Sequence, residues 1–165
     1  MTGVKTVDLG ITRVWWVTTI AALPAITAAE ITAGKDISKS LLPDYSFGAD
    51  ASTTVSERDI TALFDSNTPT IGKYKGSLHL FRKLLVTGIA GSDDLLTAFT
   101  GLPHGYLVRR VGPPATQALA AADVVDVGEF IADVPQQEAG TGSGFLKLTI
   151  PLLSQGYYYP SLAVT

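Results

Sequence analysis

The 165-residue sequence contains no cysteine, which excludes a disulfide framework, a thiolate metal site and a cysteine nucleophile. Histidine is scarce, and His79 and His104 lack the spaced His, Asp or Glu partners of a zinc site. No serine lies in a Gly-x-Ser-x-Gly elbow, and the glycine-rich residues 140–144 lack the lysine and following helix of a phosphate-binding loop. The sequence therefore predicts no catalytic residues, no metal ion and no cofactor, and we do not expect an enzyme.

Charged side chains are also few, at 16% of the residues compared with an average of about 25% in soluble proteins. The net charge of -3 argues against nucleic-acid binding, which depends on clustered Lys and Arg. Mean hydropathy is +0.28. We interpret the low fraction of charged residues as a sign that part of the surface is hidden in an assembly. The length favours one domain, residues 1–165, which buries roughly 70% of the surface of its unfolded chain.

The sequence lacks a hydrophobic run long enough to cross a membrane. Residues 14–29 carry no charge and resemble a signal peptide, but Asp8 lies in the leader and Pro24 interrupts the apolar part. The stretch is also shorter than the about 20 apolar residues of a transmembrane helix, so we expect no membrane partner. Residues 11–20 instead predict a strand, in which the pair Trp15-Trp16 places one ring on each face.

Patterns typical of β-strands dominate the rest of the chain. Residues 53–63 and 70–82 form the longest candidate hairpin, with turn residues between them. Residues 70–82 carry mixed side chains on both faces, which indicates that part of this sheet meets something other than water. Further strands are predicted at residues 106–110, 123–133 and 145–152.

Two short helices are predicted beside these strands. Thr27 and Glu30 fit a capping box, and Gly34 ends the helix that follows. Ser92 is a cap candidate for the second helix, which ends before Gly101. Between the first helix and the hairpin, residues 35–52 read as a long loop, which is of the length that is usually functional or disordered.

Arg109 and Arg110 form the sharpest basic feature of the sequence. They fall on opposite faces of one predicted strand, so they do not make a nucleic-acid patch. We expect them to form ion pairs with the acidic strand 123–133, whose Val125, Val127 and Phe130 point inward.

The order of these features resembles the major tail tube protein of long-tailed, siphovirus-type bacteriophages, especially those that infect actinobacteria. The resemblance covers most of the chain. It rests on residues 27–31 followed by 34–37, the strand around residues 54–55, residues 76–82 (Gly-Ser-Leu-His-Leu-Phe-Arg) and residues 105–110 (Gly-Tyr-Leu-Val-Arg-Arg).

This resemblance implies a mainly β fold of the α+β kind, a β-sandwich or half-barrel with one or two short flanking helices. It also implies a structural virion protein, assembled in the host cytoplasm and located in the tail. Six copies would form a ring, and rings would stack into a tube through which DNA passes without specific binding. The implied partners are the protein itself, the tape measure protein, the tail terminator and the tail tip proteins.

Candidate assembly residues follow from the resemblance together with the sequence pattern. The loop of residues 35–52 is expected to reach toward the adjacent ring, and the hairpin to supply strands of the inner barrel. Glu57 and Asp59 share a strand face and are candidates for charge that faces the lumen. Candidate contacts between subunits are Trp15, Trp16, Asp44, Tyr45, Phe47, Tyr157, Tyr158 and Tyr159, with core packing as an equal alternative for the tryptophans and the tyrosines at 157–159.

Other functions stay open at the level of sequence. The nearest is a tail terminator or head-tail joining protein, which would form a ring but no filament. A carbohydrate-binding β-sandwich is more remote, with Trp15, Tyr45 and Tyr157 as stacking platforms for sugars. A small hydrolase ranks below both, because no nucleophile has a recognisable activating base.

Overall fold

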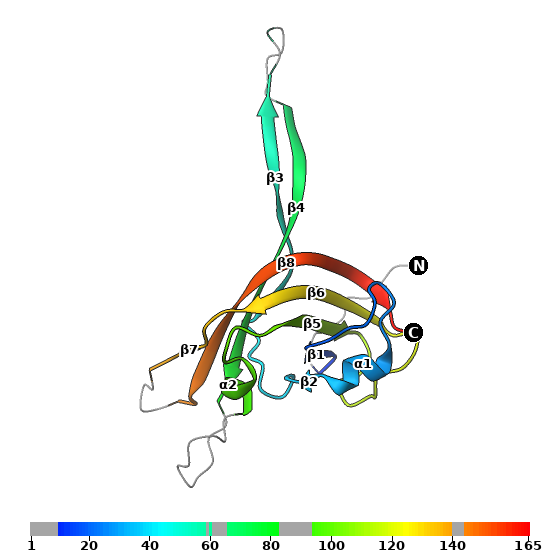
Figure 1. Cartoon of the computed structure of the whole chain (residues 1–165), viewed down its shortest axis with the longest axis vertical. Helices are drawn as coiled ribbons and strands as arrows, with labels where there is room; N and C mark the ends of the chain where they lie inside the picture. The colour runs from blue at the N-terminus through cyan, green and yellow to red at the C-terminus, as the bar shows by residue number, and fades with distance from the viewer. Residues whose placement is uncertain (1–9, 59, 61–65, 83–93, 140–143) are drawn as a thin grey trace.

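The computed structural model describes residues 10–58, 60, 66–82, 94–139 and 144–165, which form one antiparallel sheet with two short helices (Figure 1). The strand order is β2-β1-β5-β6-β8-β4-β3, and β7 also pairs with β8. The elements are β1 (Thr12–Val17), α1 (Ala28–Ala33), β2 (Lys35–Asp36), β3 (Ser46–Glu57), β4 (Ser66–Phe81), α2 (Asp94–Ala98), β5 (His104–Val111), β6 (Val124–Ala132), β7 (Gln136–Gln137) and β8 (Lys147–Ala163). The predicted mainly β fold is confirmed, in its half-barrel form.

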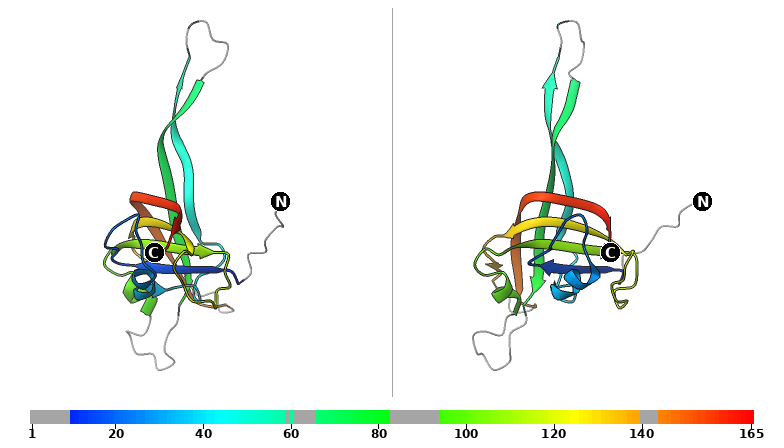
Figure 2. Two further views of the ribbon diagram at one scale, coloured as in Figure 1. Left: turned by 90° about the vertical axis from the view of Figure 1, so that its right-hand side faces the viewer. Right: turned by 45° about the vertical axis from the view of Figure 1, so that its right-hand side comes forward.

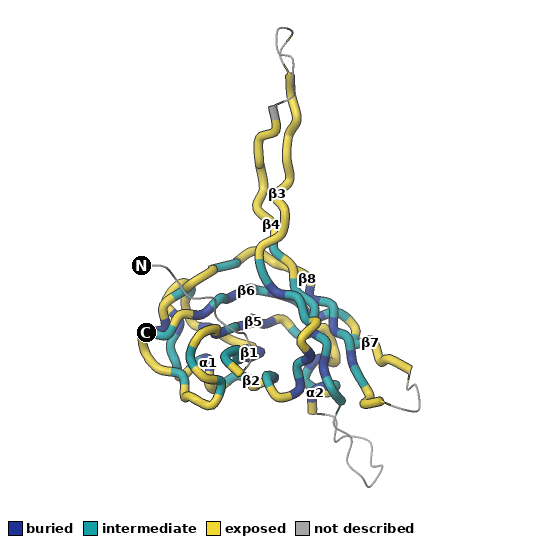
Figure 3. The backbone as a smooth tube through the Cα atoms, turned by 180° about the vertical axis from the view of Figure 1, so that it is seen from behind, coloured by how far each residue is buried: buried dark blue, intermediate teal, exposed yellow. Residues whose placement is uncertain are grey.

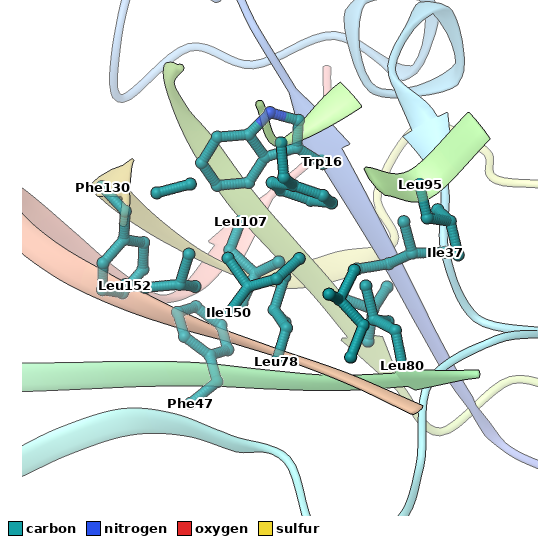
Figure 4. Packing of buried hydrophobic residues seen from close by; sticks show 14 residues of the cluster. Trp16, Ile37, Phe47, Leu78, Leu80, Leu95, Leu107, Phe130, Ile150 and Leu152 are labelled. Carbon is teal, nitrogen blue, oxygen red and sulfur yellow. The ribbon is translucent and has the colours of Figure 1, made fainter. Parts of the chain in front are cut away.

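The sheet is strongly curved and has hydrophobic clusters on both faces. The inner face carries Trp16, Leu107 and Phe130, which pack against side chains of β4, β8 and α2 (Figure 4). The outer face carries Trp15 and Val127, which α1 and the C-terminal residues cover. Because neighbouring strand residues point to opposite faces, the central strands carry apolar side chains on both faces of the sheet.

Trp15 and Trp16 lie in this double core, each with 2% of its surface exposed. Trp16 contacts Phe99 after α2 at 5.1 Å between ring centroids. Core packing within one subunit therefore accounts for both indoles, and we propose no subunit contact for them.

Both arginines of the predicted pair make the expected ion pairs with the acidic strand. Arg109 Nη2 lies 2.7 Å from Asp126 Oδ2 on the inner face, and Arg110 Nη1 lies 2.9 Å from Asp123 Oδ2. The Arg110 side chain is fully buried and also donates hydrogen bonds to the carbonyl oxygens of residues 114, 117 and 118. Arg110 therefore holds the connection between β5 and β6 against the body.

The first helix has the predicted capping box. The Thr27 hydroxyl accepts from the Glu30 backbone N–H, and the Glu30 carboxylate accepts from the Thr27 N–H at 2.8 Å. Glu30 also accepts from the Ala21 N–H, and these hydrogen bonds lower the pKa of its carboxyl group. The cap thus fixes the helix to the segment that precedes it.

The predicted loop at residues 35–52 is wrong at its two ends, where residues 35–36 form β2 and residues 46–52 belong to β3, whereas residues 37–45 form neither a helix nor a strand. Ile37 is buried in the inner core, and its backbone N–H donates to Val14 of β1. The backbone of Ser40 and Leu42 bonds to that of Phe81 and His79, so residues 40–42 lie along β4. Strand β3 then begins at Ser46, seven residues before the predicted start at Thr53. The loop interpretation failed because serine, aspartate and glycine, typical of turns, here occupy a strand with polar surroundings on both sides.

Two other boundaries differ from the predictions. Strand β5 begins at His104, two residues before the predicted start at residue 106. The last strand, predicted at residues 145–152, is the 17-residue β8, which also contains the tyrosines at residues 157–159. The predicted cap Ser92 lies outside the described residues.

Arg110→Met should lower the free energy of unfolding by about 3–5 kcal/mol, because it leaves the Asp123 carboxylate and several carbonyl groups without their partner. Urea denaturation followed by circular dichroism measures this. Lys75→Met is the matched control, since its ion pair with Asp50 is largely exposed to water and therefore contributes little to stability. Equal effects of the two substitutions would contradict the role of Arg110.

Asp123→Asn should destabilise the protein at neutral pH, and the difference in stability from the natural protein should disappear in acid. Hydrogen bonds from the Ala120 N–H and the Arg110 guanidinium lower the Asp123 pKa below 3.8. Its contribution is thus present above pH 3.8 and is lost as pH falls through the lowered folded-state pKa. Urea midpoints of both proteins from pH 7 to pH 2 should converge in acid, and a constant difference would refute this.

Candidate assembly surfaces

Among the described residues no group of three or more His, Asp or Glu side chains is placed to hold a metal ion. No helix in the described part of the chain is both long and apolar enough to span a membrane. The features that distinguish the described surface are a projecting hairpin and a group of tyrosines, one exposed and two half-buried. Both suit contacts with other protein surfaces better than chemistry on a small molecule.

The hairpin of β3 and β4 projects far from the body (Figures 1 and 2). We call residues 49–57 and 67–73 the arm. Every one of these residues is exposed (Figure 3), including Val55 at 46% and Ile71 at 65%. Register shifts near Thr53 interrupt the pairing of its strands. A two-stranded ribbon of this kind is only marginally stable by itself in water.

The backbone edges of the arm have no strand partner within the described residues. Strand β3 ends the sheet order, so its outer edge is open. Strand β4 pairs with β8 only from Gly76 to Phe81, so its edge is open along the arm. Beyond Leu152, strand β8 pairs with β6 along one edge, and its other edge no longer pairs with β4. Open edges present rows of N–H and C=O groups that favour pairing with another chain.

The arm joins the body at a cluster of aromatic rings, which we call the arm root: Phe47, Tyr74, Phe130 and Tyr158. Phe47 packs edge-on against Phe130 at 6.0 Å and against Tyr158 at 5.9 Å between centroids. Arg109 lies over the Phe47 ring at 5.1 Å and donates from Nη1 to the Phe47 carbonyl oxygen at 3.1 Å. The first strand of the arm is thus fixed through both its side chain and its backbone.

Asp126 stabilises the positive charge of Arg109 at this partly buried position. Burial disfavours the charged form, but hydrogen bonds to Asp126 and Tyr45 outweigh it and raise the Arg109 pKa. Asp126 in turn accepts from the Ser161 N–H at 3.0 Å. The guanidinium therefore links β3, β5, β6 and β8.

Two glycines make room for the rings of the arm root. A Cβ atom at Gly128 would lie 2.8 Å from both Phe47 and Phe130, and one at Gly76 would lie 3.0 Å from Phe130 and Leu152. Gly48 has φ of 152°, a backbone region that side chains rarely adopt, where β3 leaves the body. The close packing and the bend of the arm root both depend on glycine.

The outer face carries what we call the tyrosine patch: Tyr106, Tyr157 and Tyr159 around Glu129. Tyr106 is paired with Glu129, and Tyr159 with Val127, so all lie on one face. Tyr157 and Tyr159 stack at 6.2 Å between centroids, and Tyr157 is 55% exposed. Burial first, and then the negative charge of Glu129, raise the Tyr106 pKa, so its hydroxyl stays protonated. Exposed tyrosines of this kind are enriched in protein interfaces.

A model of the family described as "Phage tail tube protein" matches residues 1–165. The chain belongs to the phage tail tube protein family. Among solved structures, a chain of the "Cryo-EM structure of the anti-feeding prophage (AFP) baseplate, 6-fold symmetrised" is similar with a TM-score of 0.56 and 12% identity, over 97% of this chain and 98% of that chain. Comparison with curated protein sequences gives no match.

This tail tube protein is a structural component of the virion tail, built to assemble with other tail proteins. The residues that the sequence predicts for assembly contacts lie in different surroundings in the structure. Tyr157 is exposed and Tyr159 half-buried in the tyrosine patch, whereas Tyr158 points into the arm root. Glu57 is exposed at the far end of β3, and Asp59 lies outside the described residues.

The remaining candidates belong to the segment before the arm. Asp44 is 64% exposed and pairs with His79 Nδ1 at 2.9 Å, and a hydrogen bond from this histidine lowers its pKa. Tyr45 is half-buried against the inner core, and Phe47 is buried in the arm root. Sequence reasoning missed Tyr74, because its strand pattern resembles that of its neighbours and its partners are distant in sequence.

Phe47→Ala should lower the free energy of unfolding by about 3–5 kcal/mol, because it leaves a cavity between Phe130, Tyr158 and Arg109. Tyr157→Ala, at an exposed aromatic, should change it by about 0.5 kcal/mol or less. Thermal and urea denaturation measure both. An unchanged stability of Phe47→Ala would mean that Phe47 serves contacts outside the subunit instead.

Proposed function

We propose that this tail tube protein forms hexameric rings that stack into the hollow tube through which the phage genome leaves the capsid. The observation that carries the proposal is the arm, whose residues are exposed on all sides and whose edges pair with no strand in the described chain. The sixfold symmetry reported for the anti-feeding prophage particle supports a ring of six. Six copies of 17.3 kDa would make a closed ring of about 104 kDa.

In this ring, the arm would bind an adjacent subunit and its open edges would extend the sheet of the neighbour. The exposed part of the tyrosine patch would be covered by another subunit, as predicted for Tyr157 and Tyr159. Pairing edge to edge into a closed barrel removes the unpaired N–H and C=O groups of every subunit at once. Closure therefore supplies the cover that the isolated arm lacks.

The role in genome passage would be passive. The net charge of -3 and the scarcity of Lys and Arg disfavour retention of DNA, which moves more freely along a weakly acidic wall. Glu57 and Asp59 are the proposed lumen-facing acids. The proposed partners, besides further copies, are the tape measure protein, the tail terminator and the tail tip proteins. No enzymatic step is part of this proposal.

A variant in which Asn-Gly replaces residues 51–72 tests the role of the arm. It joins the paired residues Asp50 and Lys73 by a two-residue turn suited to hairpins. Circular dichroism should show a folded body, because the arm contributes no residue to either hydrophobic cluster. Negative-stain electron microscopy across a concentration series should show tubes for the natural protein and none for the variant.

The outcomes separate the alternatives. Normal tubes from the shortened variant would refute the role of the arm. Discrete rings and no tubes from the natural protein, even with preformed tube ends as seeds, would favour a terminator or joining protein. Dispersed monomers at high concentration would contradict ring formation altogether.

A further inference from the structure

The point where the arm separates from the sheet creates a problem of backbone pairing. β4 and β8 pair up to Gly76 and Leu152 and then separate. β8 continues along β6, but its register shifts: Phe130 pairs with Ser154, whereas Gly128 pairs with Tyr158. Three residues of β8, 155–157, therefore lie opposite Glu129 alone. A bulge of this kind leaves backbone groups without ladder partners.

The phenol of Tyr74, at the base of the arm, satisfies these groups. Its hydroxyl oxygen accepts from the Gln155 N–H at 2.9 Å and from the Gly156 N–H at 3.1 Å. It donates to the Glu129 carbonyl oxygen at 2.6 Å. One side chain of β4 thus bonds to both strands that border the bulge, at distances typical of good hydrogen bonds.

The Tyr74 ring is held as firmly as its hydroxyl. It stacks on Tyr158 at 5.4 Å with 16° between the planes, and meets Phe130 edge-on at 5.2 Å. Burial raises its pKa, against the effect of the two N–H donors, so the proton that bonds to the Glu129 carbonyl is retained. A ring held on two sides and bonded at its tip leaves β4 little freedom to rotate at this point.

We infer that Tyr74 is a positioning residue, which bridges β6 and the bulge of β8 and so sets the direction of the arm before any second subunit binds. The role of the arm in assembly is taken from the proposed function, whereas its direction is inferred from the contacts of Tyr74. Phe47 and Gly48 fix the other strand at the same level, so both strands leave the body at a defined angle. A preset arm loses less conformational freedom on assembly than a loose one.

Distance measurement between two spin labels tests the inference on dilute, unassembled subunits. The absence of natural cysteine allows labelling at Thr54→Cys on the arm and Ala29→Cys on α1, both at exposed positions. Pulsed electron paramagnetic resonance should give one narrow distance distribution for the otherwise natural protein. Tyr74→Phe keeps the ring but removes the three hydrogen bonds, and the narrow peak should be lost to a broad distribution.

Two controls sharpen this experiment. Tyr157→Phe removes a hydroxyl from an exposed tyrosine and should leave the distribution narrow. Ile31→Val removes a methyl group from the outer hydrophobic cluster, away from the arm, and shows how lower stability of the whole subunit by itself affects the distance distribution. An unchanged distribution in Tyr74→Phe would overturn the inference, and so would equal broadening in Ile31→Val. Because no tube is needed for the measurement, failure here is distinct from failure of the arm in assembly.

Discussion

Strand β8 has to satisfy its backbone hydrogen bonds with different neighbours along its length, and the rest of the structure depends on how it does so. Its first residues lie between β4 and β7, and from Leu152 onward it pairs with β6, which is its neighbour on one side only once β4 has separated. The arm begins at the point where β4 stops pairing with β8. Tyr74 supplies the hydrogen bonds that the bulge of β8 lacks at this junction. The same side chain thus contacts the base of the arm and both strands that border the bulge.

The body can hold such a projection because it is packed on both faces. Trp15 and Trp16 sit on opposite sides of one strand, and Val127 and Phe130 do the same on another. Arg109 and Arg110 divide in the same way, one bonded into the arm root and the other into the connection after β5. A sheet with two cores resists bending, which is useful for a subunit that has to present an arm at a defined angle.

The scarcity of charge in this chain fits the proposed assembly. In stacked rings, part of the subunit surface would be removed from water, so charged residues there would have to be desolvated between subunits. In this chain, several of the charges described already have partners within the subunit, such as Arg109 with Asp126 and Asp44 with His79. Few uncompensated charges would then need to be buried on assembly.

The sequence by itself determined the mainly β class, the capping box of α1, the ion pairs of Arg109 and Arg110, and the placement of Trp15 and Trp16 on opposite faces of one strand. Each depends on residues near one another in sequence or on simple strand alternation. That both indoles are buried within one subunit was decided only by the tertiary structure. Nor did the sequence determine that residues 46–52 continue a strand or that β8 runs through the tyrosines at 157–159. It also left Tyr74 indistinguishable from other strand residues. Those features depend on which strands pair and where they separate, and hydrogen bonds between residues such as Tyr74 and Gln155, 81 positions apart, are decided only when the sheet closes.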